Sequence, residues 1–343
     1  MLEATLNLVE AGCDLTMDQM AQAICLIMEG RCSDDEIARL LLALRRKGET
    51  VDELAGAAAA MRSKMTPIRT SRTDVVDTCG TGGDGLRTFN ISTAAALVTA
   101  AAGVPVAKHG NRSVTSRSGS ADVLAALGVN IGADVGCVEA CLEELGICFC
   151  FAPLLHEAMK HVAPVRKRLG SPTIFNMLGP LANPARAAFQ LVGVGRPELR
   201  GLLAQALARL GTQRSLVVHG SDGLDEVTLG GVTYVSEACG GRLGEFQWRP
   251  TDFGVPPAAS AQFVVAGPEQ SAAIIRALLE GQKGPARDIV LVNAAAALWT
   301  AGRGATLAEC LAKAANAIDS GAAAGLLARL IELTNQPPAP ARR

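Results

Sequence analysis

The stretch VVDTCGTGGDGLRTFNIST, residues 75–93, decides the fold. It starts with β-branched residues, passes through a glycine-rich turn, and leads into an alanine-rich helix that Asn90, Ser92 or Thr93 would cap. Strand-like runs followed by loops recur later in the chain, at residues 104–107 and 215–218. Strands that alternate with helices in this way form β-α-β units. The sequence therefore predicts an α/β fold with a central, largely parallel sheet flanked by helices.

The glycine loop matches the letter of the dinucleotide pattern G-x-G-x-x-G, but its surroundings exclude a dinucleotide site. That site needs its third glycine in the first turn of the helix and an acidic residue about 20 positions later. Here Leu-Arg-Thr-Phe separates Gly85 from the helix, and the next strand leads into Lys108 and His109. A Walker loop is also excluded, because Leu86 and Arg87 stand where Lys and Ser or Thr are required.

Glycine N–H groups followed by a helix N-terminus still form an anion site. Asp84 is unexpected there, because a carboxylate repels phosphate unless it binds sugar hydroxyls or a cation. The loop therefore predicts a phosphorylated sugar with a metal ion nearby. A plain strand-to-helix connection is the alternative for this loop taken alone.

Two later segments add the charges that such a ligand needs. Residues 108–116, KHGNRSVTS, bring two cations, an amide and hydroxyl groups together after a strand, where the carboxyl edge of a sheet places its ligands. Asp225 and Glu226 follow another strand and offer the oxygen ligands that Mg²⁺ prefers, with Ser92 as a third oxygen. Together these segments favour a polyanion bound with a divalent cation over an ordinary solvated loop.

The composition limits the kind of core and the classes of partner that the protein can have. The chain has 343 residues, of which 49% are hydrophobic, 19% charged and 3% aromatic, so its core is built mainly from Ala, Leu and Val. The formal net charge of −1 gives no general attraction to nucleic acid or an anionic membrane. No signal peptide or membrane span is apparent, and we expect a cytoplasmic protein. For the cysteine cluster, packed thiols are favoured over a metal site: Cys137, Cys141, Cys148 and Cys150.

The character of the sequence changes near residue 70. Residues 1–69 carry only helical patterns, with capping signals at Thr16 and Ser33, and are expected to form a helical N-terminal domain. A larger α/β domain is expected over residues 70–334, and residues 165–187, which include a turn-rich insertion at 176–184, are expected to pack against the helical domain. The proline-rich residues 335–343 are expected to be a mobile tail.

In their order and combination, these motifs resemble those of the anthranilate phosphoribosyltransferases, a family of the nucleoside phosphorylase and phosphoribosyltransferase class with a helical and an α/β domain. The resemblance runs from the first helices nearly to the C-terminus. It rests on GTGGD at 80–84, TFNIST at 88–93, KHGNR at 108–112 with Ser116, SGSAD at 118–122, HEAMK at 156–160 with VRK at 165–167, FNMLGPL at 175–181 with Asn183 and Pro184, and GLDE at 223–226.

The resemblance implies a magnesium-dependent pentosyltransferase of tryptophan biosynthesis. Such an enzyme moves phosphoribose from 5-phosphoribosyl 1-diphosphate to the amine of anthranilate and releases diphosphate. The family further implies two Mg²⁺ ions, small-molecule substrates, no nucleic-acid or membrane partner, and a homodimer formed through the helical domain.

The resemblance also assigns site residues. Those implied to bind phosphoribosyl diphosphate are Gly80, Gly82, Gly83, Asp84, Thr88, Asn90, Ser92, Thr93, Lys108, Asn111, Arg112, Ser113, Ser116 and Ser120. Those implied to bind anthranilate are Gly80, His109, Asn111, His156 and Arg166, of which Arg166 pairs with the carboxylate. The implied magnesium ligands are Ser92, Asp225 and Glu226.

The implied chemistry needs no strong base. The aromatic amine is neutral at pH 7, and the loss of diphosphate leaves an oxocarbenium-like centre, so the enzyme must stabilise the leaving group and position the nucleophile. His109 is the candidate proton acceptor, and a role in shaping the pocket is its alternative. One departure lies at Ser171 and Pro172: relatives usually carry Arg-Thr after the Leu-Gly of this region, so a cation near the domain interface is absent.

Two other functions are weighed against this one. Pyrimidine nucleoside phosphorylases share the architecture, but they bind inorganic phosphate and need no paired magnesium carboxylates. A non-catalytic relative that binds nucleic acid should be basic and should have lost part of the site, whereas this chain is slightly acidic and keeps every motif. Hinge closure between the domains is a further expectation, because loops of both must meet around one substrate.

Overall fold

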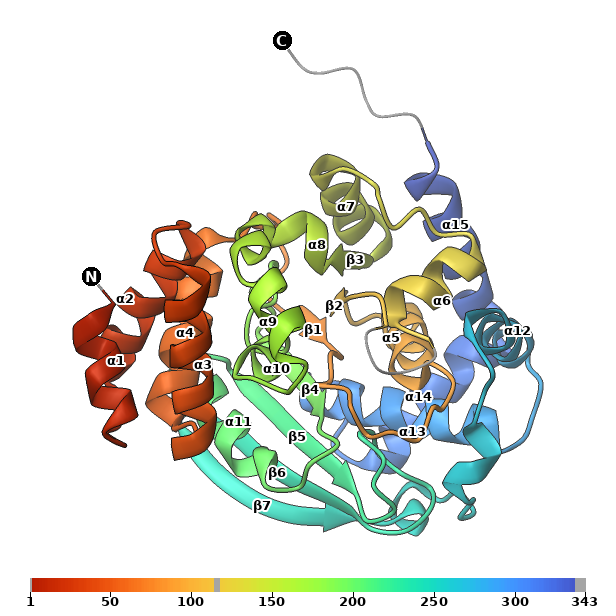
Figure 1. Cartoon of the computed structure of the whole chain (residues 1–343). Helices are drawn as coiled ribbons and strands as arrows, with labels where there is room; N and C mark the ends of the chain where they lie inside the picture. The colour runs from red at the N-terminus through yellow and green to blue at the C-terminus, as the bar shows by residue number, and fades with distance from the viewer. Residues whose placement is uncertain (1, 114–117, 337–343) are drawn as a thin grey trace.

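The computed structural model describes residues 2–113 and 118–336. Four helices begin the chain and form the bundle at the left of Figure 1: α1 (Glu3–Glu10), α2 (Met17–Met28), α3 (Asp34–Lys47) and α4 (Val51–Lys64). The predicted capping signals at Thr16 and Ser33 are confirmed, and Thr50 forms a third capping box, at the start of α4. In each box the cap side chain accepts the N3 backbone N–H and the N3 side chain bonds back, which fixes where the helix starts.

A buried carboxylate holds the connections of this bundle. Glu53 is fully buried and accepts the backbone N–H of Leu15 at 3.0 Å and that of Thr50 at 2.9 Å. Glu53 also accepts a hydrogen bond from the Lys47 ammonium at 3.0 Å. The charge of Glu53 is therefore compensated inside the bundle, as a buried charge requires.

A seven-stranded sheet forms the centre of the larger α/β domain (Figure 1). Its strands are β1 (Val76–Asp77), β2 (Val106–Gly110), β3 (Ile147–Phe151), β4 (Phe189–Gly193), β5 (Arg214–Gly220), β6 (Thr233–Cys239) and β7 (Arg242–Trp248). They lie in the order β3-β2-β1-β4-β5-β6-β7. The strands from β3 to β5 are parallel, and β6 and β7 extend the sheet as antiparallel strands. The predicted largely parallel sheet is confirmed, and the antiparallel pair is an addition that was not predicted.

Eleven further helices lie in the described part of the α/β domain. They are α5 (Ile91–Ala101), α6 (Ser120–Leu127), α7 (Val135–Ala140), α8 (Ala152–Leu155), α9 (Ala163–Leu169), α10 (Phe175–Leu178), α11 (Leu199–Arg209), α12 (Pro268–Leu279), α13 (Pro285–Thr300), α14 (Leu307–Asp319) and α15 (Ala322–Thr334). Helix α5 packs against α13, α14 and α15. Both α5 and α13 are rich in buried alanine, and these small side chains let the helices approach closely.

Two apolar cores organise the chain. The larger core lies between the sheet and the helices around α5 and α13, and it includes Cys141, Cys148 and Cys150 as small buried side chains. The second core joins the N-terminal bundle to α9, α10 and α11, through residues such as Val165 and Phe175. Helices α9 and α10 therefore pack with the first four helices, although they follow β3 in the chain. Among the described residues, no helix is long and apolar enough to cross a membrane.

Candidate active site

The carboxyl ends of β1, β2, β4 and β5 meet at one edge of the sheet. The loops that follow these strands, together with α9 and α10, enclose a cavity of about 400 Å³. The residues singled out from the sequence that line it are Gly80, Gly82, Gly83, Asp84, Thr88, Asn90, Ser92, Thr93, Lys108, His109, Asn111, Arg112, Ser113, Ser120, Arg166, Asp225 and Glu226. His156 is absent from this lining, and Ser116 lies outside the described residues. This edge of a parallel sheet is where α/β proteins bind their ligands.

Three carboxylates converge on one side of this cavity. Asp84 of the glycine loop lines the cavity beside Asp225, and Glu226 Oε1 accepts the backbone N–H of Ser92 at 3.1 Å. Burial, together with the negative charges of Asp84 and Glu226, raises the pKa of Asp225 well above its usual range. Burial also raises the pKa of Glu226 to about 7. The negative charges of this cluster are not fully compensated, and its all-oxygen donor set fits Mg²⁺.

Lys108 is a fixed cation beside these carboxylates. Its side chain is 4% exposed, and its Nζ donates to Thr78 O at 2.9 Å and to Ser92 Oγ at 3.3 Å. Its charge opposes the rise in the pKa of Glu226. The sequence predicts Lys108 and His109 in the loop after the strand. This prediction is wrong, because the pairing of β2 with β3 continues to Gly110 and both residues lie in β2. Both side chains are therefore held by the sheet.

The glycine loop is anchored to the neighbouring strand β4. Thr81 N–H donates to the carbonyl oxygen of Gly193 at 2.9 Å. A Cβ atom on Gly193 would overlap the backbone carbonyl of Asp225, so this glycine lets the glycine loop and the Asp225 segment lie together. Gly193 was missed from the sequence. The available signal was a glycine at the end of a strand, at the sheet edge where the other site residues gather.

Asn90 connects three segments of the site. It occupies the N-cap of α5, as one of the three predicted candidates, but its side chain forms no capping bond. Its Oδ1 instead accepts from Ser118 Oγ at 2.7 Å and from Ser271 Oγ at 2.8 Å. The capping prediction for this side chain is wrong, because these two hydroxyl groups occupy it.

The loop after β2 is held by Asp122. This carboxylate accepts the backbone N–H of Ser113 at 2.9 Å and that of Gly119 at 3.0 Å, so it joins the two described ends of the loop. It also accepts from Arg112 Nη1 at 3.0 Å. These bonds hold the pKa of Asp122 below its usual value despite its partial burial. Arg112 is thus already paired with Asp122 of α6.

Two histidines and an arginine occupy the end of the site nearest the N-terminal bundle. His109 Nδ1 lies 2.9 Å from the Gly179 carbonyl oxygen, and its Nε2 lies 3.2 Å from Nε2 of His156. Burial lowers the pKa of His109 to about 3 and that of His156 to about 4. His156 therefore lies behind His109 instead of lining the cavity. With both ring nitrogens engaged, His109 is better suited to shape the pocket than to accept a proton.

Arg166 of α9 reaches the same end of the cavity. Its guanidinium carbon lies 5.8 Å from the centre of the Phe175 ring, and its Nη2 donates to Asn176 Oδ1 at 3.4 Å. Asn176 also accepts the backbone N–H of Thr173 at 3.0 Å, which fixes its orientation. Burial lowers the pKa of Arg166 from its usual value. A partly buried guanidinium with one long hydrogen bond to a described residue is available to an anionic ligand.

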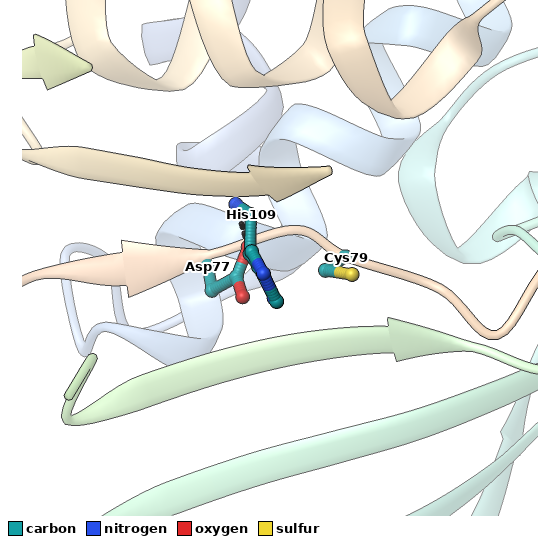
Figure 2. A group of neighbouring side chains, drawn as sticks. All are labelled: Asp77, Cys79 and His109. Atoms are coloured by element: carbon teal, nitrogen blue, oxygen red, sulfur yellow. Dashed lines mark hydrogen bonds between the residues drawn. The ribbon is translucent and has the colours of Figure 1, made fainter. Parts of the chain in front are cut away.

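Asp77, Cys79 and His109 form a group of three neighbouring side chains (Figure 2). Asp77 from β1 accepts the backbone N–H of His109 at 3.1 Å, and Cys79 lies two residues further along the same segment. Side-chain atoms of the three residues that are able to bind metal lie within 4.8 Å of one another. Burial raises the pKa of the Cys79 thiol and raises that of Asp77 to about 6. A protonated thiol and an engaged imidazole are poor metal ligands, so we assign this group to the support of His109.

The chain matches two family models, which together span most of its length. The model described as "Glycosyl transferase family, a/b domain" covers residues 72–324, and "Glycosyl transferase family, helical bundle domain" covers residues 5–65. An anthranilate phosphoribosyltransferase of Rhodospirillum rubrum is 52% identical over 336 residues, which are 98% of this chain and 96% of that protein. One of Moorella thermoacetica is 50% identical over 96% of this chain and 98% of that protein.

Solved structures give the same result. The crystal structure of the anthranilate phosphoribosyltransferase of Thermus thermophilus has a TM-score of 0.92 and 43% identity, covering 96% of this chain and 99% of that one. The enzyme from Saccharomyces cerevisiae, in complex with PRPP and Mg, has a TM-score of 0.88 and 29% identity, covering 97% of this chain and 98% of that one. Fold, site and sequence agree over nearly the whole length, and the chain belongs to the anthranilate phosphoribosyltransferase family.

Proposed function

We propose that this protein catalyses the magnesium-dependent transfer of phosphoribose from 5-phosphoribosyl 1-diphosphate to the amine of anthranilate, in tryptophan biosynthesis. The observation that carries the proposal is the distribution of charged side chains along one cavity. Asp84, Asp225 and Glu226 lie with Lys108 in one region, and Arg166 lies in another. The first group suits a metal-bound diphosphate, and the second suits a carboxylate. The yeast relative, for its part, has been solved with PRPP and Mg and with 4-fluoroanthranilate.

Asp225, Glu226 and Ser92 would hold the magnesium, for which we propose two ions. The charge of the metal would supply Lewis-acid stabilisation of the diphosphate as it leaves. Lys108 is held near Glu226 before any substrate arrives. Its charge therefore needs no rearrangement to stabilise the leaving diphosphate. In this proposal the three oxygen ligands and the lysine bind and orient the leaving group.

The remaining phosphate contacts come from backbone and hydroxyl groups. The positive φ values of Gly82 and Gly83, 66° and 85°, allow a tight turn at the cavity, and we propose that backbone N–H groups of this turn bind phosphate oxygens. For the rest of the phosphoribosyl diphosphate we propose Gly80, Asp84, Thr88, Asn90, Thr93, Asn111, Arg112, Ser113, Ser116 and Ser120. Arg112 is paired with Asp122, so it would contribute by holding the loop after β2 in shape.

Anthranilate would bind at the end of the cavity that α9 borders. Arg166 would pair with its carboxylate, and Asn111, Gly80 and His109 would line the position of the ring and amine. The amine is neutral at pH 7, so its orientation toward C1 of the ribose contributes more than its deprotonation. His109, supported by His156 and Asp77, would fix the shape of this pocket.

The wider organisation is part of the same proposal. We propose domains at residues 1–69 and 70–334 that close on the substrates, and a homodimer formed through the helical domain. Leu8 of α1 and Leu42 of α3 support the dimer, because these large apolar side chains are 38% and 47% exposed on packed neighbouring helices. All ten cysteines are free, which supports the cytoplasm as the compartment. A purely monomeric sedimentation profile at micromolar concentration would contradict the dimer.

The direct test follows anthranilate fluorescence after mixing the protein with anthranilate, 5-phosphoribosyl 1-diphosphate and Mg²⁺. We expect a decrease that EDTA prevents and that the double variant Asp225→Asn/Glu226→Gln lacks. The Glu280→Gln variant is a control at an exposed carboxylate outside the cavity, and it should keep the wild-type rate. No consumption by a folded wild-type protein with both substrates present would refute the proposed function.

A further inference from the structure

The glycine loop contains a strained residue to which the proposed function gives no role. Arg87 has a φ of 58°, in the left-handed region, where a side chain costs about 1–2 kcal/mol. Among residues 2–113 and 118–336, Arg186 is the only other residue besides glycine with a positive φ. Gly or Asn is expected at such a position. An arginine in this place indicates that its side chain serves a purpose that offsets the strain.

The backbone of Arg87 is fixed by a neighbouring segment. Its carbonyl oxygen accepts the N–H of Val265 at 3.0 Å, and Thr88 forms a β-bridge with Val264. Phe89 N–H donates to Phe263 O at 2.8 Å, one step further along. These bonds leave the loop little freedom to relax, so the left-handed conformation is imposed on whichever residue occupies position 87.

The side chain of Arg87 lies where two cavities meet. Arg87 borders the 400 Å³ cavity described above and a second one of about 740 Å³, which the glycine loop shares with residues of α3, α10 and α11. The residue is exposed, and its side chain forms no hydrogen bond or ion pair with another residue of the described chain. No described partner therefore competes with a ligand for its guanidinium.

The surrounding charges favour a polyanion bound with a metal ion as that ligand. Asp84, three residues before Arg87, lines the same cavity as Asp225 and, besides burial, raises the pKa of that carboxyl by its negative charge, so this loop lies near the proposed metal ligands. Leu86 N–H donates to Asp84 Oδ1 at 3.1 Å, which fixes the turn between Asp84 and Arg87. A diphosphate held there adds negative charge to three carboxylates, and Lys108 alone compensates little of it. A second cation at the rim would stabilise that charge.

We propose that Arg87 binds the diphosphate part of 5-phosphoribosyl 1-diphosphate at the junction of the two cavities. This inference rests on the proposed function and adds a binding residue to it. Arginine suits the role because its planar guanidinium donates two parallel hydrogen bonds to phosphate oxygens. Affinity for the substrate then offsets the backbone strain.

Three variants separate the charge of residue 87 from its backbone strain. Arg87→Lys keeps both, Arg87→Ala keeps the strain and removes the charge, and Arg87→Asn removes both, because Asn tolerates the left-handed region. The measurements are KM for each substrate with kcat, calorimetric binding of magnesium diphosphate without anthranilate, and the thermal midpoint of unfolding.

We expect Arg87→Ala and Arg87→Asn to weaken magnesium diphosphate binding and to raise KM for 5-phosphoribosyl 1-diphosphate by about tenfold, equivalent to about 1.4 kcal/mol. Arg87→Lys should change both by less than about threefold, since a single charge-assisted hydrogen bond survives. KM for anthranilate should be unchanged in all three. The thermal midpoint should rise in Arg87→Asn alone.

Wild-type affinity for magnesium diphosphate in both Arg87→Ala and Arg87→Asn would overturn the proposal. An affinity that follows the strain, so that Arg87→Asn differs from Arg87→Ala, would overturn it as well. Failure of the proposed function is distinguishable, because wild-type protein would then neither consume anthranilate nor bind magnesium diphosphate. That outcome would overturn both proposals together.

Discussion

The substitution Gly193→Ala tests whether the packing of backbone segments sets the position of the proposed metal ligands. A Cβ atom at residue 193 would lie 2.6 Å from the carbonyl carbon of Asp225. Carbon atoms rest at about 3.5–4.0 Å, and the Asp225 carbonyl oxygen overlaps the added Cβ still more closely, so one of the two segments must move by at least about 1 Å. The strand β4 is bonded on both sides, to β1 and to β5, and the Asp225 segment is therefore the part expected to move.

A displacement of about 1 Å at a catalytic group can lower activity about 100-fold. We expect kcat/KM of the Gly193→Ala variant to fall by about that factor, and the Mg²⁺ concentration needed for half-maximal rate to rise. The overpacking itself is expected to cost about 1–3 kcal/mol of stability. The rate is measured from anthranilate fluorescence over a magnesium titration, and the fold is checked by circular dichroism and urea unfolding.

The matched control is Gly201→Ala in α11. A Cβ atom there meets no atom within 4 Å, and Gly to Ala inside a helix stabilises by about 1 kcal/mol. This variant should keep the wild-type rate and magnesium requirement. If Gly193→Ala also keeps both, to within about threefold, the carboxylates do not depend on that close approach and the reasoning is refuted.

Three further outcomes are expected. Glu53→Ala should lower the free energy of unfolding by about 3 kcal/mol, because it removes the buried partner of Lys47 and the acceptor of two backbone N–H groups. Asp14→Ala removes only the exposed partner of Lys47 and should cost far less in urea unfolding; equal effects would contradict this. Burial raises the pKa of Asp77 from 3.8 to about 6, so the folded state holds that proton more tightly than the unfolded chain and its stabilisation is lost as pH rises. Wild type should therefore lose about 2–3 kcal/mol relative to Asp77→Asn between pH 4 and pH 7, and a constant difference would contradict the shift. Arg166→Lys should raise KM for anthranilate about tenfold and leave that for 5-phosphoribosyl 1-diphosphate unchanged, since only the first loses a two-bond contact; equal changes in both would argue against a carboxylate at Arg166.

Local signals predicted most of the architecture. The glycine loop between a β-branched run and an alanine-rich helix indicated the β-α-β unit, and Thr16 and Ser33 marked helix starts that the structure confirms. The gathering of the three motif segments followed from one rule, that loops after parallel strands share an edge of the sheet. These predictions hold because each depends on neighbours in the sequence or on a general property of parallel sheets.

The features that were missed depend on contacts between distant segments. Lys108 belongs to β2 because β3 continues the pairing, and no local pattern at Lys108 records that partner. The side chain of Asn90 is taken up by Ser118 and Ser271, the second of which lies in α12, far along the chain. The antiparallel strand β7 is largely exposed, so it lacks the apolar alternation that marks a half-buried strand.

Helix α9 has two faces with different partners. Val165 is buried in the core shared with the N-terminal bundle, and its neighbour Arg166 borders the cavity. A rigid helix transmits any shift of the bundle to the guanidinium, so Arg166, the proposed carboxylate-binding group, moves with the N-terminal bundle and not with the glycine loop. If Arg166 binds the acceptor carboxylate as proposed, the affinity for the acceptor depends on the position of the N-terminal bundle. A ligand that binds best with Arg166 in one position therefore also favours the corresponding position of the bundle. The affinities of acceptor analogues with shifted carboxylates would then report the relative position of the two domains.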